Sequence, residues 1–386
     1  MVKKSCRSYL VVATVFLAGL VLLNCGGGRM SSPSPGSCPV LPILTSSSGS
    51  IASAVDPLVA SEMKAQGLVG MTVAIAKGGT VLYTQAYGYA DLSTCRAMQS
   101  TAEFQVGSIT KQFTAAAVLQ LQNTGKLNID DPVITYLPSY AFDPRITLRM
   151  LLNQTSGLGD YLNFSAVNSW VNGVPEPTVL SQVAQAPLMF TPGSAFSYSN
   201  SNYFVLGSII EAASPLSYAN YLAADIFQPV GLTKTSYLQP SAFASPYLAG
   251  QVPGRIPAPS LFFAAGALWS NVQDLATWDA ALLNGKVIPS TLFTTMVTPP
   301  PVPNFPQGGP SNYAMGWVRD TDLGHPFVWH NGETSSYTSF NSMFLDDGFS
   351  AIILTNGPVN EDTPLLNLGE QIINAICSSP ATAGNC

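Results

Sequence analysis

The sequence predicts an α/β (α+β) fold in which one antiparallel sheet is built from both ends of the chain and is flanked by helices. Strand-like patterns occur near the start, at 71–76 and 81–87, and return near the end, at 327–330, 337–345 and 349–354. The residues between them are patterned mainly for helices. We expect one domain at 51–376 with a tail at 377–386. Within it, 51–107 and 266–376 form a sheet lobe and 108–265 an inserted helical lobe.

The composition favours a large core and excludes a nucleic-acid surface. The chain has 386 residues, of which 47% are hydrophobic and only 9% are charged, and its net charge is −6. This length supports one large domain or two coupled lobes. A negative chain without a basic cluster beyond its first residues offers no electrostatic footprint for DNA or RNA.

Residues 1–24 are typical of an export signal. A basic start precedes an apolar run at 9–23, which is shorter than the roughly 20 residues of a membrane-spanning helix. The residues around Cys25 resemble a bacterial lipobox, although Asn24 replaces the usual small residue. We expect lipid on Cys25, the alternatives being a plain signal peptide or an uncleaved anchor. Residues 25–50 are typical of a flexible tether. The protein is therefore expected outside the cytoplasm, in the periplasm or membrane-anchored as a bacterial lipoprotein, or else secreted.

The four cysteines that follow Cys25 suit an exported protein with disulfides. Cys377 and Cys386 would close a short C-terminal loop, and Cys38 with Cys95 would fasten the tether to the domain. The sequence does not fix this pairing. None of the four has the surroundings of a thiolate nucleophile.

In chain order, the pattern starts with a helix near 51–67, followed by a hairpin around Lys77-Gly78-Gly79. A helix that begins on Ser108 should stop near Gly125. Further helices are expected at 148–154, 179–186, 202–213 and 218–227. Near the end, Asp346-Asp347-Gly348 is a turn between two strands, and a closing helix spans 364–376.

The first candidate for chemistry is Ser108, followed three residues later by Lys111. Residues i and i+3 of a helix share a face, so the lysine amine can reach the serine hydroxyl. Such a lysine activates serine only if desolvation or a nearby cation lowers its pKa. Ser61 and Lys64 have the same spacing, but they fall on the polar side of an amphipathic helix and are assigned to the surface. The alternative for Ser108 is a helix N-cap.

The second candidate is the pair Tyr198 and Asn200, on a loop just before a helix. A Tyr198 phenolate near Lys111 could act as the base, with the lysine charge lowering the tyrosine pKa. Tyr161 and Tyr218 occur in the same short pattern. Tyr218 is expected in the core, and Tyr161 is left as a wall of the cleft between the lobes.

The third candidate is the stretch from His330 to Glu333, which leads into the last strands. The backbone N–H groups of Glu333 and Ser108 can hold an oxyanion together, a contribution of roughly 3 kcal/mol per donor. Gly332 would let the substrate approach closely. His330 either anchors a carboxylate, shares a proton with Tyr198, or is a packing residue. Lys234 begins a stretch assigned to a surface loop.

No metal or other cofactor is expected. His325 and His330 are the only histidines, and a proline lies between them without a nearby cysteine. This arrangement is a poor zinc site.

Three motifs in this order, Ser108-Ile109-Thr110-Lys111, Tyr198-Ser199-Asn200 and His330-Asn331-Gly332, resemble the serine β-lactamase and penicillin-binding-protein superfamily. The most similar branch holds class C β-lactamases, D-alanyl-D-alanine carboxypeptidases and family VIII carboxylesterases. The segments 151–158, 206–211 and 266–270 are similar as well, and the resemblance covers about 50–376.

The resemblance implies that Ser108 forms an acyl-enzyme, that Lys111 and Tyr198 manage its proton, and that Asn200 holds Lys111 or the acyl group. The family usually has Lys-Thr-Gly as its third motif, whereas this chain has His330 and Asn331, and histidine is only partly charged at neutral pH. The expectation is therefore an esterase or D-alanyl-D-alanine carboxypeptidase-like hydrolase with at most weak β-lactamase activity. Its substrates would be small esters, β-lactams or peptidoglycan peptides. Glu333 and Ser336 are expected to narrow the cleft mouth. The alternative is an inactive module that binds peptidoglycan or a protein partner, and the oligomeric state stays open.

Overall fold

The large sheet joins the two ends of the chain at its centre. The computed structural model describes residues 38–39, 49–303, 312–322, 324–359 and 364–378. Seven antiparallel strands follow the order β3-β2-β1-β11-β10-β9-β8, and β1 pairs with β11 so that Met71 lies opposite Thr355. Their bounds are β1 (Gly70–Lys77), β2 (Thr80–Asp91), β3 (Arg96–Ala97), β8 (Val318–Asp322), β9 (His325–Glu333), β10 (Thr338–Phe344) and β11 (Phe349–Thr355). The predicted sheet built from both termini is confirmed.

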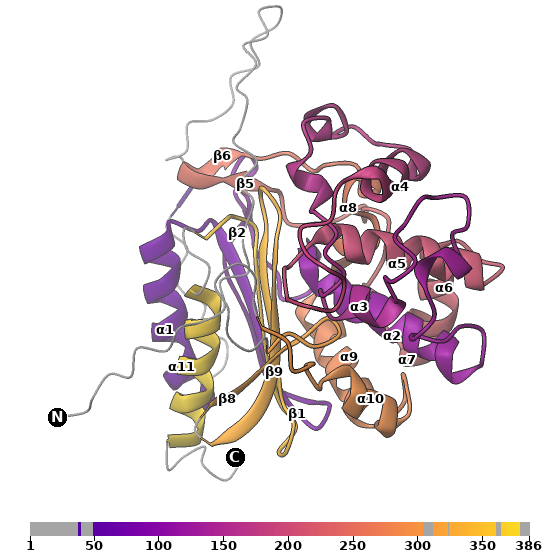
Figure 1. Ribbon diagram of the computed structural model, residues 1–386. Helices are drawn as coiled ribbons and strands as arrows, with labels where there is room; N and C mark the ends of the chain where they lie inside the picture. The colour runs from indigo at the N-terminus through magenta and orange to yellow at the C-terminus, as the bar shows by residue number, and fades with distance from the viewer. Residues whose placement is uncertain (1–37, 40–48, 304–311, 323, 360–363, 379–386) are drawn as a thin grey trace, which may run out of the picture.

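Helices cover both faces of this sheet. On one face α1 (Ser50–Gln66) packs against α11 (Pro364–Ser378), and on the other α9 (Val272–Leu283) packs on β1 and β11 (Figure 1). The helix α1 stops because Gly67 takes a left-handed φ of 66°. Separate apolar clusters fill the two sides, so the sheet lies between two cores.

The helical part lies on the α9 side of the sheet (Figure 1). Its central helix is α2 (Thr110–Asn123), which is buried over most of its length. Around it lie α3 (Leu148–Leu152), α4 (Glu176–Gln185), α5 (Asn200–Ala213), α6 (Tyr218–Tyr221), the π-helical η5 (Leu222–Phe227), α7 (Gln228–Val230), α8 (Pro259–Phe262) and α10 (Ser290–Met296). The helices expected between 108 and 265 are present.

Between 266 and 376 the sequence analysis found strands and a closing helix but missed α9 and α10. The side chain of Asn271 accepts a hydrogen bond from Asp274 N and thereby caps α9. The apolar residues of α9 face both the sheet and α2. The helix therefore lacks the regular alternation of apolar and polar faces by which a helix is recognised in a sequence. The short edge strand β8 was also missed.

Smaller elements complete the domain. Two-residue strands pair as β4 (Phe104–Gln105) with β7 (Trp269–Ser270) and β5 (Tyr247–Leu248) with β6 (Val252–Pro253). The 3-10 turns are η1 (Gly107–Ile109), η2 (Val133–Thr135), η3 (Tyr161–Asn163), η4 (Val167–Ser169), η6 (Ala249–Gln251) and η7 (Phe263–Ala265).

A disulfide joins Cys38 to Cys95, one of the two pairings considered from the sequence. Cys377 is also disulfide-bonded, but Cys386 lies outside the described residues, as do the export signal, Cys25 and most of the tether. Within the described residues, every helix is too short or too polar to traverse a lipid bilayer.

Candidate active site

Ser108 sits in a tight turn that two glycines make possible. The strand β4 ends at Gln105, the 3-10 turn η1 carries Ser108, and α2 starts at Thr110. Gly107 has a φ of 51°, and a Cβ there would lie 2.7 Å from Glu333 N. A Cβ on Gly332 would lie 2.0 Å from Val106 O and 3.0 Å from Ser108 N. The chain at 106–108 and the end of β9 therefore touch backbone to backbone.

This contact is possible because β8 covers only part of β9. The first residue of β8, Val318, pairs with Trp329, whereas β9 continues to Glu333 and pairs there with β10. Beyond Trp329, η1 packs against β9 in place of a strand. The two backbone amides expected to hold an oxyanion, those of Ser108 and Glu333, thus belong to adjoining segments. Their joint role stays a prediction.

Lys111 is fully buried and directed at Ser108. Its Nζ donates to Ser108 Oγ at 2.8 Å, to Asn200 Oδ1 at 2.8 Å and to the carbonyl of Ala265 at 2.7 Å. Burial lowers the pKa of Lys111 from 10.5 to about 7, against a smaller opposing effect of the Asp160 charge. Near neutral pH the amine is therefore divided between its charged and neutral forms.

Asp160 fixes the orientation of Asn200. The Asn200 side chain and backbone nitrogens donate to Asp160 Oδ2 at 2.8 and 3.2 Å. With its Nδ2 engaged in this way, Asn200 turns its Oδ1 to Lys111. Removal from water raises the pKa of Asp160, and four opposing influences, including the Lys111 charge, lower it.

The sequence analysis missed Asp160 and Ala265. Ala265 directly precedes the segment 266–270 and Asp160 lies two residues after the segment 151–158, but an aspartate after a glycine and an alanine carbonyl form no recognisable motif. Only the fold shows that Asp160 accepts hydrogen bonds from Asn200 and that the Ala265 carbonyl accepts one from Lys111.

Tyr198 donates a hydrogen bond to Ser108 Oγ at 2.8 Å, and the Lys111 Nζ lies 4.9 Å from its ring centre. The loop that carries Tyr198 is held by Gln154, which has a φ of 61° and accepts a bond from Ser199 N. Burial raises the pKa of Tyr198 well above 10. The expected phenolate, with a pKa lowered by Lys111, is therefore wrong, because removal from water is the largest influence on this hydroxyl and raises its pKa. Tyr198 is a neutral hydroxyl at the resting site.

His330 is buried behind Tyr198 and is not exposed to a substrate carboxylate. Its Nε2 lies 3.2 Å from the Tyr313 hydroxyl, and its ring centre is 6.1 Å from that of Tyr198. Burial, helped by the Lys111 charge, lowers its pKa to about 3, so it is neutral. Of the roles considered for His330, packing fits this position and anchoring a carboxylate does not.

Most of the other residues considered from the sequence fall outside the site. Tyr161 is fully buried and donates to the Leu261 carbonyl, so the expectation that it lines the cleft is wrong. Tyr218 is in the core, and Ser61 and Lys64 are exposed, as expected. Lys234 is exposed, although its neighbour Thr235 is buried against Asp274. Ser336 is buried and Glu333 is partly exposed.

Comparison with known proteins shows which family the chain belongs to. The family model described as Beta-lactamase matches residues 55–373. The putative penicillin-binding protein PbpX of Bacillus subtilis is 31% identical over 267 residues, which make up 67% of this chain and 64% of that protein. Protein flp of Staphylococcus aureus is 28% identical over 338 residues, with 83% of this chain and 66% of the relative covered. The chain thus spans slightly less than two thirds of the length of these curated relatives.

Solved structures share the fold. An octameric penicillin-binding protein homologue from Pyrococcus abyssi superposes with a TM-score of 0.73 at 24% identity, over 86% of this chain and 78% of the other. A D-stereospecific amidohydrolase from a Streptomyces species gives 0.68 at 25% identity, over 82% and 97%. Because the family model covers most of its length, the chain belongs to the Beta-lactamase family, a family of serine hydrolases that share the β-lactamase fold.

Proposed function

We propose that this protein is a serine hydrolase that cleaves esters or amides through an acyl-enzyme on Ser108. The observation that carries the proposal is the buried Lys111 amine, 2.8 Å from Ser108 Oγ and with a pKa of about 7. At neutral pH about half of such lysines are unprotonated and can act as a base. Serine becomes a nucleophile when a base of this kind lies within hydrogen-bond reach. An exposed lysine would remain an ammonium ion.

Acylation begins when neutral Lys111 takes the proton of Ser108. The Oγ then bonds to the substrate carbonyl carbon, and the carbonyl oxygen becomes an oxyanion beside the Ser108 and Glu333 amides. The proton must next reach the leaving nitrogen or oxygen. Tyr198 touches the same Oγ, so its hydroxyl can give a proton to the leaving group and regain one from Lys111. The bond to the leaving group breaks, and an ester of Ser108 remains.

Deacylation repeats these proton transfers with water. Neutral Lys111, through Tyr198, takes a proton from the attacking water, and the new carbon–oxygen bond displaces Ser108, which recovers its proton. Asn200 keeps the amine in place during both halves because Asp160 holds its amide from behind.

We further propose that substrates without a carboxylate, such as simple esters and D-amino-acid amides, are cleaved better than β-lactams. His330 is buried and neutral and supplies no charge for the carboxylate that a dedicated β-lactamase must hold. The Streptomyces relative in the fold comparison is described as D-stereospecific, which supports including D-amino-acid amides.

The first test is hydrolysis of p-nitrophenyl butyrate and D-alanine p-nitroanilide by the wild type and by Ser108→Ala. Turnover that disappears in the folded variant is expected. Equal turnover in both proteins would mean that another residue is the nucleophile. No turnover by the wild type on these compounds, on β-lactams or on D-alanyl peptides would favour the non-catalytic binding module.

We also propose that the protein is exported and carries lipid on Cys25. Its support is the sequence at 1–28. Metabolic labelling with a palmitate analogue should mark the wild type and leave Cys25→Ala unlabelled. Labelling of both would place the lipid elsewhere, and an absence of label would indicate a plain signal or an uncleaved anchor.

A further inference from the structure

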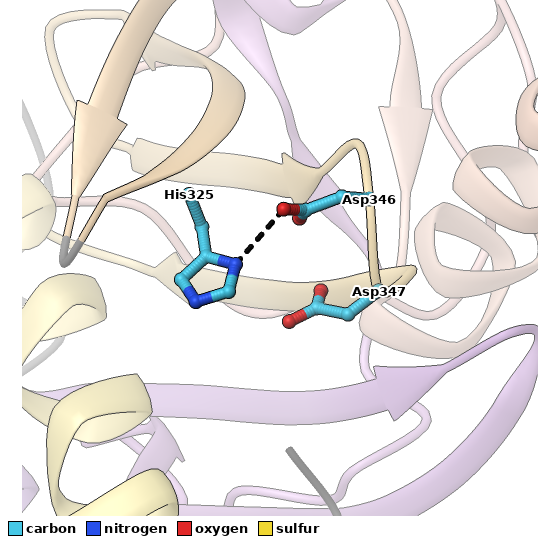
Figure 2. Close-up of side chains that lie close together, drawn as sticks. All are labelled: His325, Asp346 and Asp347. Atoms are coloured by element: carbon cyan, nitrogen blue, oxygen red, sulfur yellow. Dashed lines mark hydrogen bonds and ion pairs between the residues drawn. The ribbon is translucent and has the colours of Figure 1, made fainter.

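A second group of ionisable side chains gathers at the opposite end of β9 from Glu333. His325 is the first residue of this strand, and Asp346 and Asp347 lie in the turn between β10 and β11. Figure 2 shows the imidazole and the two carboxylates pointing toward one another. The strand separates this cluster from Glu333 by about 25 Å, at about 3.3 Å per residue. The cluster therefore belongs to a part of the surface that the proposed hydrolysis does not use.

The spacing of the three side chains suits one cation. His325 Nδ1 lies 2.9 Å from Asp346 Oδ2, and one ligand atom from each of the three residues lies within 4.8 Å of the others. Two ligands that each bind Zn²⁺ at about 2.1 Å in a tetrahedron are about 3.4 Å apart. His325 and Asp346 are exposed and Asp347 is partly exposed, so small side-chain rotations would bring all three to that separation. A nitrogen and two carboxylates are a donor set that Zn²⁺ accepts.

One oxygen of a third carboxylate, that of Asp322, lacks a hydrogen-bond partner among the described residues. Asp322 pairs with His325 across β8 and β9, so their side chains share one face of the sheet. Asp322 is only 7% exposed, and its Oδ2 makes no hydrogen bond to any residue that the structure describes. The pKa of His325 is raised chiefly by its hydrogen bond to Asp346, and the Asp322 charge adds a smaller contribution. A buried carboxylate oxygen without a donor is costly unless a cation lies nearby.

We propose that His325, Asp346 and Asp347, with Asp322 behind them, form a binding site for a divalent transition-metal cation, with Zn²⁺ as the first candidate. The sequence analysis did not expect a metal because it considered His325 together with His330. The two histidines lie five residues apart along β9, and the ligands that join His325 come from the turn between β10 and β11 instead. A bound cation would fasten the start of β9 to the β10–β11 turn and stabilise the folded protein by linkage.

The test is titration of the full-length protein with ZnCl₂ by isothermal calorimetry. The protein is prepared without a histidine tag, in detergent, and treated with a chelator before dialysis. We expect one Zn²⁺ per chain at this site, and binding at least about tenfold weaker in His325→Ala and in Asp346→Asn. Asp320→Asn, two residues from Asp322 on the same strand, is the matched control and should bind like the wild type.

Comparison of the variants separates this site from any other metal ligand in the chain. Equal Zn²⁺ affinity in the wild type and in His325→Ala would overturn the proposal, as would an absence of saturable binding below 1 mM, the order of the weakest protein cation sites. Melting curves in excess chelator should be the same for all four proteins. Weaker Zn²⁺ binding by a variant would then reflect the loss of a ligand and not a failure to fold. The outcome is independent of whether Ser108 is the nucleophile.

Discussion

The chain contains the same Ser-x-x-Lys spacing in two helices, with opposite surroundings. Ser61 and Lys64 lie on the exposed side of α1, whereas Lys111 of α2 is fully buried and donates to three acceptors. Spacing brings a lysine within reach of a serine in either helix. Removal of the amine from water, which lowers the pKa of Lys111 to about 7, is what distinguishes the two pairs. The burial of the lysine, more than the spacing, makes Ser108 and Lys111 a candidate nucleophile and base.

The largest effect should come from removing that buried amine. Lys111→Ala is expected to reduce kcat/KM for p-nitrophenyl butyrate by roughly 10⁴-fold, at the upper end for a general base. Lys64→Ala should leave it unchanged. Circular dichroism verifies that both variants fold. Near-normal hydrolysis by a folded Lys111→Ala protein would refute the mechanism.

The next effect tests whether the neutral phenol relays a proton. Tyr198→Phe keeps the ring beside Lys111 and removes only the hydroxyl that touches Ser108. We expect a decrease of roughly 10²-fold in kcat. The decrease should be smaller for nitrophenyl esters than for amides, because nitrophenolate leaves without a proton and an amine does not. Equal losses on both substrates would assign Tyr198 to positioning alone.

A smaller and more diagnostic effect concerns Asp160. The rate should rise with pH as Lys111 loses its proton, through its pKa of about 7. The negative charge of Asp160 raises that pKa, so Asp160→Asn should lower it and move the acidic limb of kcat/KM to lower pH. Asp143→Asn, at an exposed ion pair with Arg145, is the control. An unmoved limb would show that Asp160 acts on the orientation of Asn200 only.

The smallest effect is expected at His330. Since this side chain is buried and neutral, His330→Gln should change kcat/KM by less than about threefold. The change should be the same for a neutral ester and for one that carries a carboxylate. If kcat/KM for the anionic ester fell more than tenfold further than that for the neutral ester, His330 would be an anchor for the substrate carboxylate after all.

The sequence predicted the parts of the site that lie on short local motifs. Ser108 and Lys111 are three residues apart, and Tyr198 and Asn200 are two apart, so one turn or one loop sets each pair. The same holds for the sheet, because strand periodicity is local. The centre is assembled from long-range contacts that leave no local pattern: the Ala265 carbonyl at Lys111 and Asp160 behind Asn200.

Charge states were the least predictable feature. The phenolate at Tyr198 and the anchoring role of His330 were inferred from neighbouring residue types, but both depend on how much water remains around a side chain. Burial is a property of the packed molecule. Likewise, α9 went unrecognised because apolar contacts on two sides hide its helical period.

The pairing of β1 with β11 also bears on how the protein is made. Met71 finds its partner only when Thr355 has left the ribosome, so the centre of the sheet stays open during nearly all of synthesis. Distant pairings of this kind form slowly, since the chain must close a long loop first. A chain that cannot complete its sheet early stays unfolded until synthesis is nearly finished, a state compatible with the export proposed above. Truncation before β11 should leave β1 without its neighbour and expose a hydrophobic strand edge to aggregation.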